Sequence, residues 1–286
     1  MASSLLDRLA QLVRDQYVLE HDIDAICASL DGPALPDDPE PVAAELTRRL
    51  QAVNHDRHLR VRHRPAGAFD GFGAEGSEQL YAREARANAG GIEQVRLLGD
   101  GVGLLAVAPY VSPVHLAAPY VTAAFTLLAD VRHLIVDVRG GRGGTPETVA
   151  LLCSYLLGGE PVHLQDLVSR HEPAHQFWTT PVAGRLAADV TVDVLTSSAT
   201  FSGCEELAYD LQALGRARVI GETTRGGAHP CDLFSLTDVL EVTVPVAASR
   251  NAVTGTNWEQ VGVRPDIACP ADEALDLVLD GARSAA

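Results

Sequence analysis

The stretch Asp193-Val-Leu-Thr-Ser-Ser-Ala-Thr-Phe-Ser-Gly-Cys-Glu-Glu-Leu-Ala-Tyr-Asp-Leu211 decides the fold, because a buried strand breaks directly into a helix within it. The apolar run from Val190 to Leu195 predicts the strand, and helical spacing of apolar residues from Glu205 to Leu214 predicts the helix. Ser202 falls at the junction, where the free N–H groups at the head of a helix favour negative charge on an oxygen. Ser202 can be read as a helix cap, because Glu205 has capping-box spacing, or as a nucleophile. This segment alone favours the cap.

Further strands and helices alternate on both sides of this junction. Such alternation predicts an α/β fold with a mainly parallel sheet and helices packed on it. The expected strands are Val102–Val107, Leu134–Val138, Pro161–Leu164, Val190–Leu195, Arg218–Gly221 and Leu240–Val246, and the expected helices between and after them are Pro119–Asp130, Pro146–Leu157 and Ala271–Arg283.

The first fifty residues have a different pattern. Residues 3–53 show helical spacing in three segments, and turn signals such as Asp31-Gly-Pro separate the last two. From Leu59 the pattern changes to short strands. We therefore expect a small helical domain over residues 1–54 and an α/β core over residues 55–286.

Composition narrows the classes of function. The chain has 286 residues, of which 47% are hydrophobic and 21% charged, and its net charge is −16. This charge argues against binding to nucleic acid or to an anionic membrane. No apolar stretch reaches the length of a membrane span and the N-terminus lacks a secretory pattern, so we expect a cytoplasmic protein.

Two residue types bear on the chemistry. The five cysteines are scattered without metal-ligand spacing, so we expect no metal and no cofactor. The 22 basic residues are all arginines, because the sequence contains no lysine.

Four segments together resemble a known family. They are Ile135–Gly144 (Ile-Val-Asp-Val-Arg-Gly-Gly-Arg-Gly-Gly), Thr200–Glu206, Gly215–Gly227 and Thr254–Asp266. Their order and spacing resemble the tail-specific, or C-terminal processing, serine peptidases of family S41. Within the family, the resemblance is to the branch that contains the interphotoreceptor retinoid-binding protein repeats and, more distantly, tricorn protease. It covers roughly residues 55–270 and implies a core of the ClpP/crotonase type, with no room for a PDZ domain between His58 and the strand at Gly103.

The resemblance makes Ser202 the nucleophile of a serine hydrolase. In most of the family the general base is a lysine shortly after a Gly-Glu pair. Here the pair is Gly221-Glu222 and the matching position is Gly227, so a Ser/Lys dyad is impossible in a chain without lysine. A serine hydroxyl needs another base to become a good nucleophile.

His58, in Asn54-His-Asp-Arg-His-Leu59, is the base that the tricorn branch implies, and Glu259 matches the carboxylate that would orient it. Histidine accepts and returns protons near neutrality, which predicts a pH–rate inflection near ~6–7. Arg57 replaces a serine that precedes this histidine in tricorn, and it could neutralise Glu259. His229 is a weaker candidate, in the loop that replaces the lysine loop, and Asp56 is read as a turn residue.

We expect the oxyanion hole to use the backbone N–H of Gly203 and one from the turn at Gly140 and Gly141. Glycines let backbone donors approach a reacting carbonyl without interference from a Cβ atom. The glycine run lacks the pattern of a phosphate loop.

The prediction is therefore a serine hydrolase that cleaves a peptide or peptide-like amide through an acyl-enzyme. A small peptide suits it better than a folded protein. Two alternatives stay open: a non-catalytic module that binds a hydrophobic small molecule, as in the retinoid-binding repeats, and an esterase, lactonase or acyl-transfer variant that uses the same Ser202.

Overall fold

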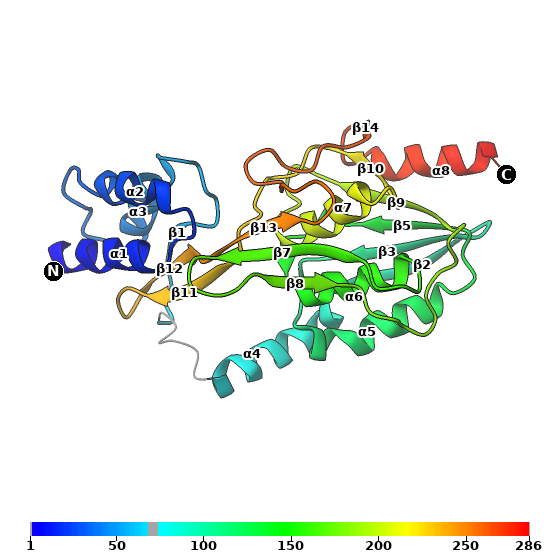
Figure 1. Cartoon of the computed structure of the whole chain (residues 1–286), viewed down its shortest axis with the longest axis horizontal. Helices are drawn as coiled ribbons and strands as arrows, with labels where there is room; N and C mark the ends of the chain where they lie inside the picture. The colour runs from blue at the N-terminus through cyan, green and yellow to red at the C-terminus, as the bar shows by residue number, and fades with distance from the viewer. Residues whose placement is uncertain (1, 68–73, 286) are drawn as a thin grey trace. The chain divides into compact units, whose positions relative to one another are not determined.

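The computed structural model describes residues 2–67 and 74–285, and the chain divides into two compact units (Figure 1). The first unit comprises Met1–Ser77, Leu167–Ala174 and His229–Ser249, and the second comprises Glu78–Asp166, His175–Ala228 and Arg250–Ala286. No helix in the described ranges is long and apolar enough to cross a membrane.

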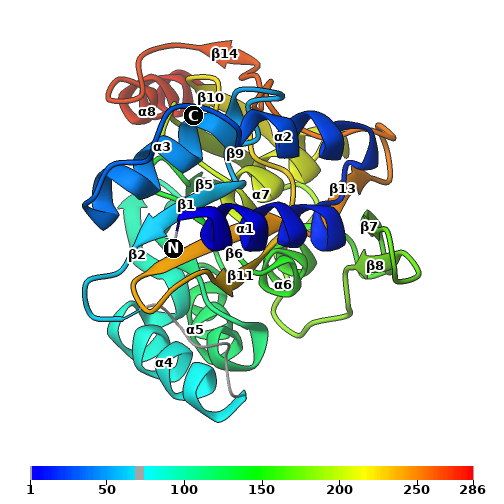
Figure 2. The same cartoon turned by 90° about the vertical axis from the view of Figure 1, so that its left-hand side faces the viewer.

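The first unit packs three helices on a small antiparallel sheet (Figure 2). The helices are α1 (Ala2–Gln16), α2 (Ile23–Ser29) and α3 (Pro39–Gln51), and the sheet has the order β1 (Arg60–His63), β12 (Leu240–Pro245), β11 (Cys231–Ser235). Leu9 and Val13 on α1 and Tyr17 just after it repeat at helical spacing and are fully buried. They form one core with Leu46 and Val242, so the predicted helices are confirmed together with the surface on which they pack.

The predicted division at residues 54/55 differs from the units that the structure forms. Val61 on β1 is buried in the same apolar cluster as the N-terminal helices. Strand β1 pairs along its length with β12, which comes almost 180 residues later in the chain. Burying one face of this sheet requires the helices, so the segment after residue 54 and the hairpin β11–β12 fold with them.

The second unit is built on a six-stranded sheet in the order β14-β10-β9-β5-β3-β2. All neighbouring strands are parallel except β2 and β3, so the predicted mixed α/β fold with a mainly parallel sheet is confirmed. The strands are β2 (Ile92–Gly99), β3 (Val102–Val107), β5 (His133–Asp137), β9 (Thr191–Thr196), β10 (Arg218–Gly221) and β14 (Ile267–Ala268).

Helices cover both faces of this sheet. The residues of α5 (Val114–Leu127), α6 (Pro146–Leu156) and α7 (Gly203–Ala213) share one apolar cluster with the sheet, and those of α8 (Ala274–Ala285) share another (Figure 1). Because both faces are covered, β3 and the centre of β5 read as continuous apolar runs. The remaining elements are α4 (Ala74–Ala87), β4 (Tyr110–Val111), β6 (Gly143–Gly144), β7 (His163–Ser169), β8 (His175–Trp178) and β13 (Ala247–Asn251), of which β13, β7 and β8 form a further small sheet.

The parallel pairing of β5 with β9 determines where the site lies. Asp137 at the end of β5 pairs with Leu195 near the end of β9, so the connections that follow the two strands leave the sheet at the same edge. One connection carries the glycine turn that follows Arg139, and the other carries Ser202. Ligand sites of parallel α/β sheets lie at this carboxyl edge.

Candidate active site

Ser202 is the N-cap residue of α7 and has backbone angles of φ 54° and ψ −128°. A residue with a side chain rarely adopts a positive φ, and such strained residues cluster at active sites. The strand β9, the turn and the helix α7 follow one another as strand, turn and helix do around the nucleophilic serine of α/β hydrolases. Ser202 thus occupies the cap position that its own segment predicts, in a conformation that a cap alone does not require.

The Glu205 carboxylate holds this strained turn. Oε2 of Glu205 accepts the N–H of Ser202 at 2.8 Å, the reciprocal arm of the predicted capping box. The same carboxylate also accepts three donors from the loop that follows β10: Oε1 accepts the Thr224 hydroxyl at 2.5 Å and the Gly226 N–H at 2.6 Å, and Oε2 accepts the Gly227 N–H at 2.9 Å. One buried side chain therefore joins the serine turn to the loop from Thr224 to Gly227.

The surroundings of Glu205 act on its charge in opposite directions. Burial raises its pKa to about 7, and the hydrogen bonds from Thr224, Gly226, Ser202 and Gly227 oppose that rise. All four groups are donors, so they complement the carboxylate form of Glu205.

The glycine that lies beside Ser202 is Gly143. A Cβ atom at Gly143 would lie 3.0 Å from the Cβ and 3.4 Å from the Oγ of Ser202, and 3.7 Å from the N of Gly203. Its φ of +130° is one that residues with side chains rarely adopt. The backbone of this residue can therefore approach a substrate carbonyl held at Ser202.

Gly140 and Gly141, the glycines of the predicted oxyanion turn, have other neighbours. The N–H of Gly141 donates to the Val138 carbonyl at 2.9 Å, so it is already committed within the turn. A Cβ atom at Gly140 would lie 3.3 Å from the Cβ of Ala108. The sequence reveals the glycine run, but it does not show which of its glycines lies against Ser202.

Cys204, on α7, contacts two glycines of the same turn. Its buried Sγ donates to the Gly143 carbonyl at 3.5 Å, and a Cβ atom at Gly141 would lie 2.6 Å from that sulfur. Gly141 is thus required for packing against Cys204, whereas Gly143 is required beside Ser202.

Glu259 lies in the second unit, against the loop after Gly227. Its Oε2 accepts the N–H of Ala228 at 2.6 Å. The neighbouring Trp258 is buried, and its indole N–H donates to the Gly227 carbonyl at 2.9 Å. The Asn-Trp-Glu segment therefore holds the backbone of the loop at Gly227 and Ala228.

His58 belongs to the first unit and is 7% exposed. Its N–H donates to Asp56 Oδ1 at 3.0 Å, and its carbonyl accepts the Thr243 hydroxyl at 2.5 Å, so both backbone groups are held. Burial is the largest cause that lowers the pKa of His58, to about 4, with His229, Arg60 and Arg62 adding to the effect and Asp56 opposing it. The imidazole is therefore neutral at pH 7, which is the form of a general base.

Asp56 is the turn residue that the sequence predicts, because its Oδ1 accepts the N–H of His58 and its carbonyl accepts that of Leu59, and its buried carboxylate has further partners. Its Oδ2 accepts the Tyr17 hydroxyl at 3.0 Å and lies 3.2 Å from Nδ1 of the buried His229. Burial alone would raise the pKa of Asp56, but His229 and His58 outweigh it, so the pKa is lowered. His229 thus has a carboxylate on one ring nitrogen, a partnership that the spacing of the sequence does not reveal.

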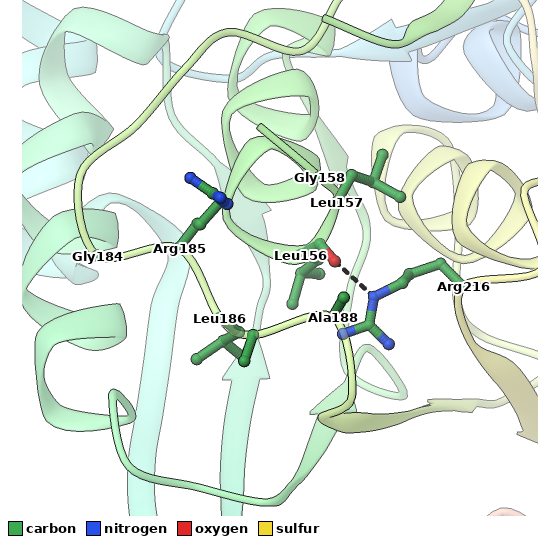
Figure 3. A pocket seen from close by; sticks show the side chains of 9 residues that line it. Leu156, Leu157, Gly158, Gly184, Arg185, Leu186, Ala188 and Arg216 are labelled. Carbon is green, nitrogen blue, oxygen red and sulfur yellow. Dashed lines mark hydrogen bonds between the residues drawn. The ribbon is translucent and has the colours of Figure 1, made fainter. Parts of the chain in front are cut away.

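A cavity of about 400 Å³ lies elsewhere in the second unit (Figure 3). It is bordered by the end of α6, the segment before β9 and Arg216, whose Nε donates to the Leu156 carbonyl at 2.5 Å. These segments precede β9 and β10, so the cavity lies at the opposite edge of the sheet from Ser202. It takes no part in the candidate active site.

Comparison with known proteins assigns the chain to a family. The fold and the serine turn define an α/β protein of the type that presents a serine at a strand–helix junction. The model of peptidase family S41 matches residues 101–269, and the chain belongs to this family.

Individual relatives and solved structures share less than a third of their aligned residues with this chain. The chain is 29% identical over 142 residues to carboxyl-terminal-processing peptidase 2 of Arabidopsis thaliana, a match that covers 49% of this chain and 27% of that protein. A putative peptidase from Parabacteroides merdae has the same fold, with a TM-score of 0.67, 17% identity and coverage of 98% of this chain and 96% of the other. Tricorn protease matches with a TM-score of 0.61 and 14% identity over 99% of this chain and 37% of its own.

Proposed function

We propose that this chain is a serine peptidase that hydrolyses a peptide bond through an acyl-enzyme, with Ser202 as nucleophile and His58 as general base. The observation that carries the proposal is the strained backbone of Ser202, held by Glu205 at the head of α7 beside Gly143. Membership of family S41 supports the peptidase class. The chain spans about a quarter of the curated relative it matches, so the activity is proposed for this chain on its own residues.

The reaction would follow the usual course of acyl transfer. The Ser202 oxygen attacks the carbonyl carbon while His58 accepts the hydroxyl proton, and the carbonyl oxygen becomes an oxyanion. The N–H of Gly203, at the head of α7, and the backbone at Gly143 would stabilise that charge. His58 then gives its proton to the leaving amine, and a water molecule, activated by the same histidine, releases the acyl group.

The composition of the chain supports a histidine as the general base. Without lysine, the side chain that serves most of the family is missing, and position 227 is a glycine whose N–H is bonded to Glu205. His58 is neutral at pH 7, as a base must be. In this proposal Glu259 stabilises the imidazolium cation, and a short peptide is the substrate.

Labelling with a fluorophosphonate probe tests the nucleophile. Wild-type protein should be labelled, Ser202→Ala should not, and Ser198→Ala, in the loop before the same turn, should be labelled like wild type. Labelling that persists in Ser202→Ala, or wild type that stays unlabelled at pH 7–8, would refute the proposal.

The base is tested with the same probe and with a peptide library. His58→Ala should slow labelling by about 10²–10⁴-fold, the usual contribution of a general base. His55→Ala removes an exposed histidine three residues away and should change little. If His229→Ala abolishes labelling while His58→Ala retains it, the base is His229.

A further inference from the structure

Two buried carboxyl groups lie on α7, the helix that Ser202 caps. Glu206 and Asp210 are four residues apart and therefore neighbours on one face of the helix. Glu206 is 4% exposed and Asp210 is fully buried. Neither has a role in the site described above.

Amide groups approach this pair from the other side. Nδ2 of Asn251 donates to Oδ1 of Asp210 at 2.8 Å. The Asn251 oxygen accepts the N–H groups of Val253 and Thr254, which fixes its amide with the NH₂ toward Asp210. The amide of the buried Gln165 lies close to Glu206 and acts to lower the pKa of its carboxyl group. These neighbours are neutral, so they supply hydrogen bonds without compensating charge.

No cation balances the two carboxyl groups within the described ranges. The ion pairs found there join other residues, and none includes Glu206 or Asp210. The titratable groups that face the pair come from α6, and they are Glu147 and the buried thiol of Cys153. Glu147 adds negative charge, and burial raises the pKa of Cys153, so the thiol stays neutral.

One oxygen of each carboxyl group has no hydrogen-bond partner in the described structure: Oε1 of Glu206 and Oδ2 of Asp210. A buried acceptor without a donor carries its full desolvation cost. Two neighbouring carboxylates buried without a cation cannot both be ionised. Burial raises the pKa of both groups, and repulsion from Asp210 raises that of Glu206 further.

We propose that Glu206 and Asp210 share one proton at neutral pH, in a carboxyl–carboxylate hydrogen bond between the two oxygens that lack other partners. A single proton then satisfies both oxygens and halves the buried charge. We call Glu206, Asp210 and their shared proton the clasp; it lies on the buried face of α7, the helix that presents Ser202.

The clasp has a defined dependence on pH. The unfolded chain releases both protons near pH 4, whereas the folded chain retains one to higher pH. Above pH ~5 the folded state therefore binds more protons than the unfolded state, and stability falls as pH rises. The fall continues through the raised pKa of the pair and ends once the folded state has also released its proton.

Unfolding of the full chain as a function of pH tests the clasp. The double variant Glu206→Gln/Asp210→Asn removes both ionisable groups and keeps their size, so its folded state holds no proton at this place. The ratio of the wild-type to the double-variant unfolding constant should rise about tenfold for each pH unit between pH 5 and 7, since wild type releases one extra proton on unfolding. Glu147→Gln, an exposed change on α6, should leave the wild-type slope almost unchanged.

A second measurement does not depend on the stability of a variant. The infrared band of a protonated carboxyl group should be present in wild type at pH 7–8 and should be lost in the double variant. Parallel slopes for wild type and the double variant, or the absence of the carboxyl band from wild type, would overturn the proposal. Stability that rises with added K⁺ or Ca²⁺ in wild type but not in the variant would also overturn it, because a cation would then occupy the place of the proton.

Discussion

The backbone N–H of Ser202 donates to Oε2 of Glu205 across 2.8 Å, and the same carboxylate receives the N–H of Gly227 at 2.9 Å. A residue that sequence reasoning assigns to a helix cap therefore connects two segments that lie more than twenty residues apart in the chain. The connection holds the Ser202 turn in its strained conformation.

Glu205→Gln should lower both stability and reactivity. The amide offers one acceptor oxygen to four donors, so at least one buried donor loses its partner, at a cost of about 1–3 kcal/mol for each such group. Urea unfolding measures the loss, and the rate of fluorophosphonate labelling should fall with it. Glu222→Gln is the matched control, because Glu222 also accepts a backbone N–H, from Ser198 at 2.8 Å, but at a solvent-accessible position. Equal losses in the two variants would contradict the role of Glu205.

Ser202→Gly should separate strain from function. Glycine adopts the φ of 54° without the clash that a side chain suffers, and such strain costs about 1–3 kcal/mol. We expect Ser202→Gly to unfold at higher urea concentration than Ser202→Ala, although both lose all labelling. If Ser202→Ala is the more stable of the two, the backbone of the turn is not strained.

Gly143→Ala should abolish activity while the chain stays folded. The added methyl group would lie 3.4 Å from Ser202 Oγ, where the substrate carbonyl must bind, and it would occupy a φ of +130°. Gly184→Ala is its control, because Gly184 also has a positive φ but open space around its Cβ position. Both variants should lose stability through the backbone, by about 1 kcal/mol or more. Only Gly143→Ala should lose peptidase turnover, and full turnover in that variant would exclude an oxyanion role for this turn.

The pH profile of kcat/KM should fall on the acid side near pH 4–5 rather than near 6–7. Burial holds the pKa of His58 at about 4, so the free enzyme keeps a neutral imidazole well below pH 6. Between about pH 6.5 and 4 the unfolded chain would take up a proton that folded His58 does not, so stability should decrease as pH falls through this window. In His58→Ala this contribution should disappear. An inflection of kcat/KM near 6.5 would show that the histidine in the working enzyme is solvated.

The sequence by itself determined the α/β class, the sheet strands β3, β5, β9 and β10 and the position of Ser202 at a strand–helix junction. These follow from local periodicity, which a chain displays whatever its partners are. The sequence also contains no lysine, and this excludes a Ser/Lys catalytic dyad.

Only the tertiary structure decided which residues surround that serine. Gly143 rather than Gly141 lies beside Ser202, because Cys204 packs against Gly141 and the Gly141 N–H is used within its own turn. Asp56 contacts His229, and β1 pairs with β12, although more than 170 residues of chain separate the partners. Helical and strand periodicity relate only residues that are close in the sequence, so they do not predict these contacts. The strain at Ser202 arises because Glu205, Thr224 and Gly226 together fix its turn, and such long-range hydrogen bonds exist only once the chain has folded.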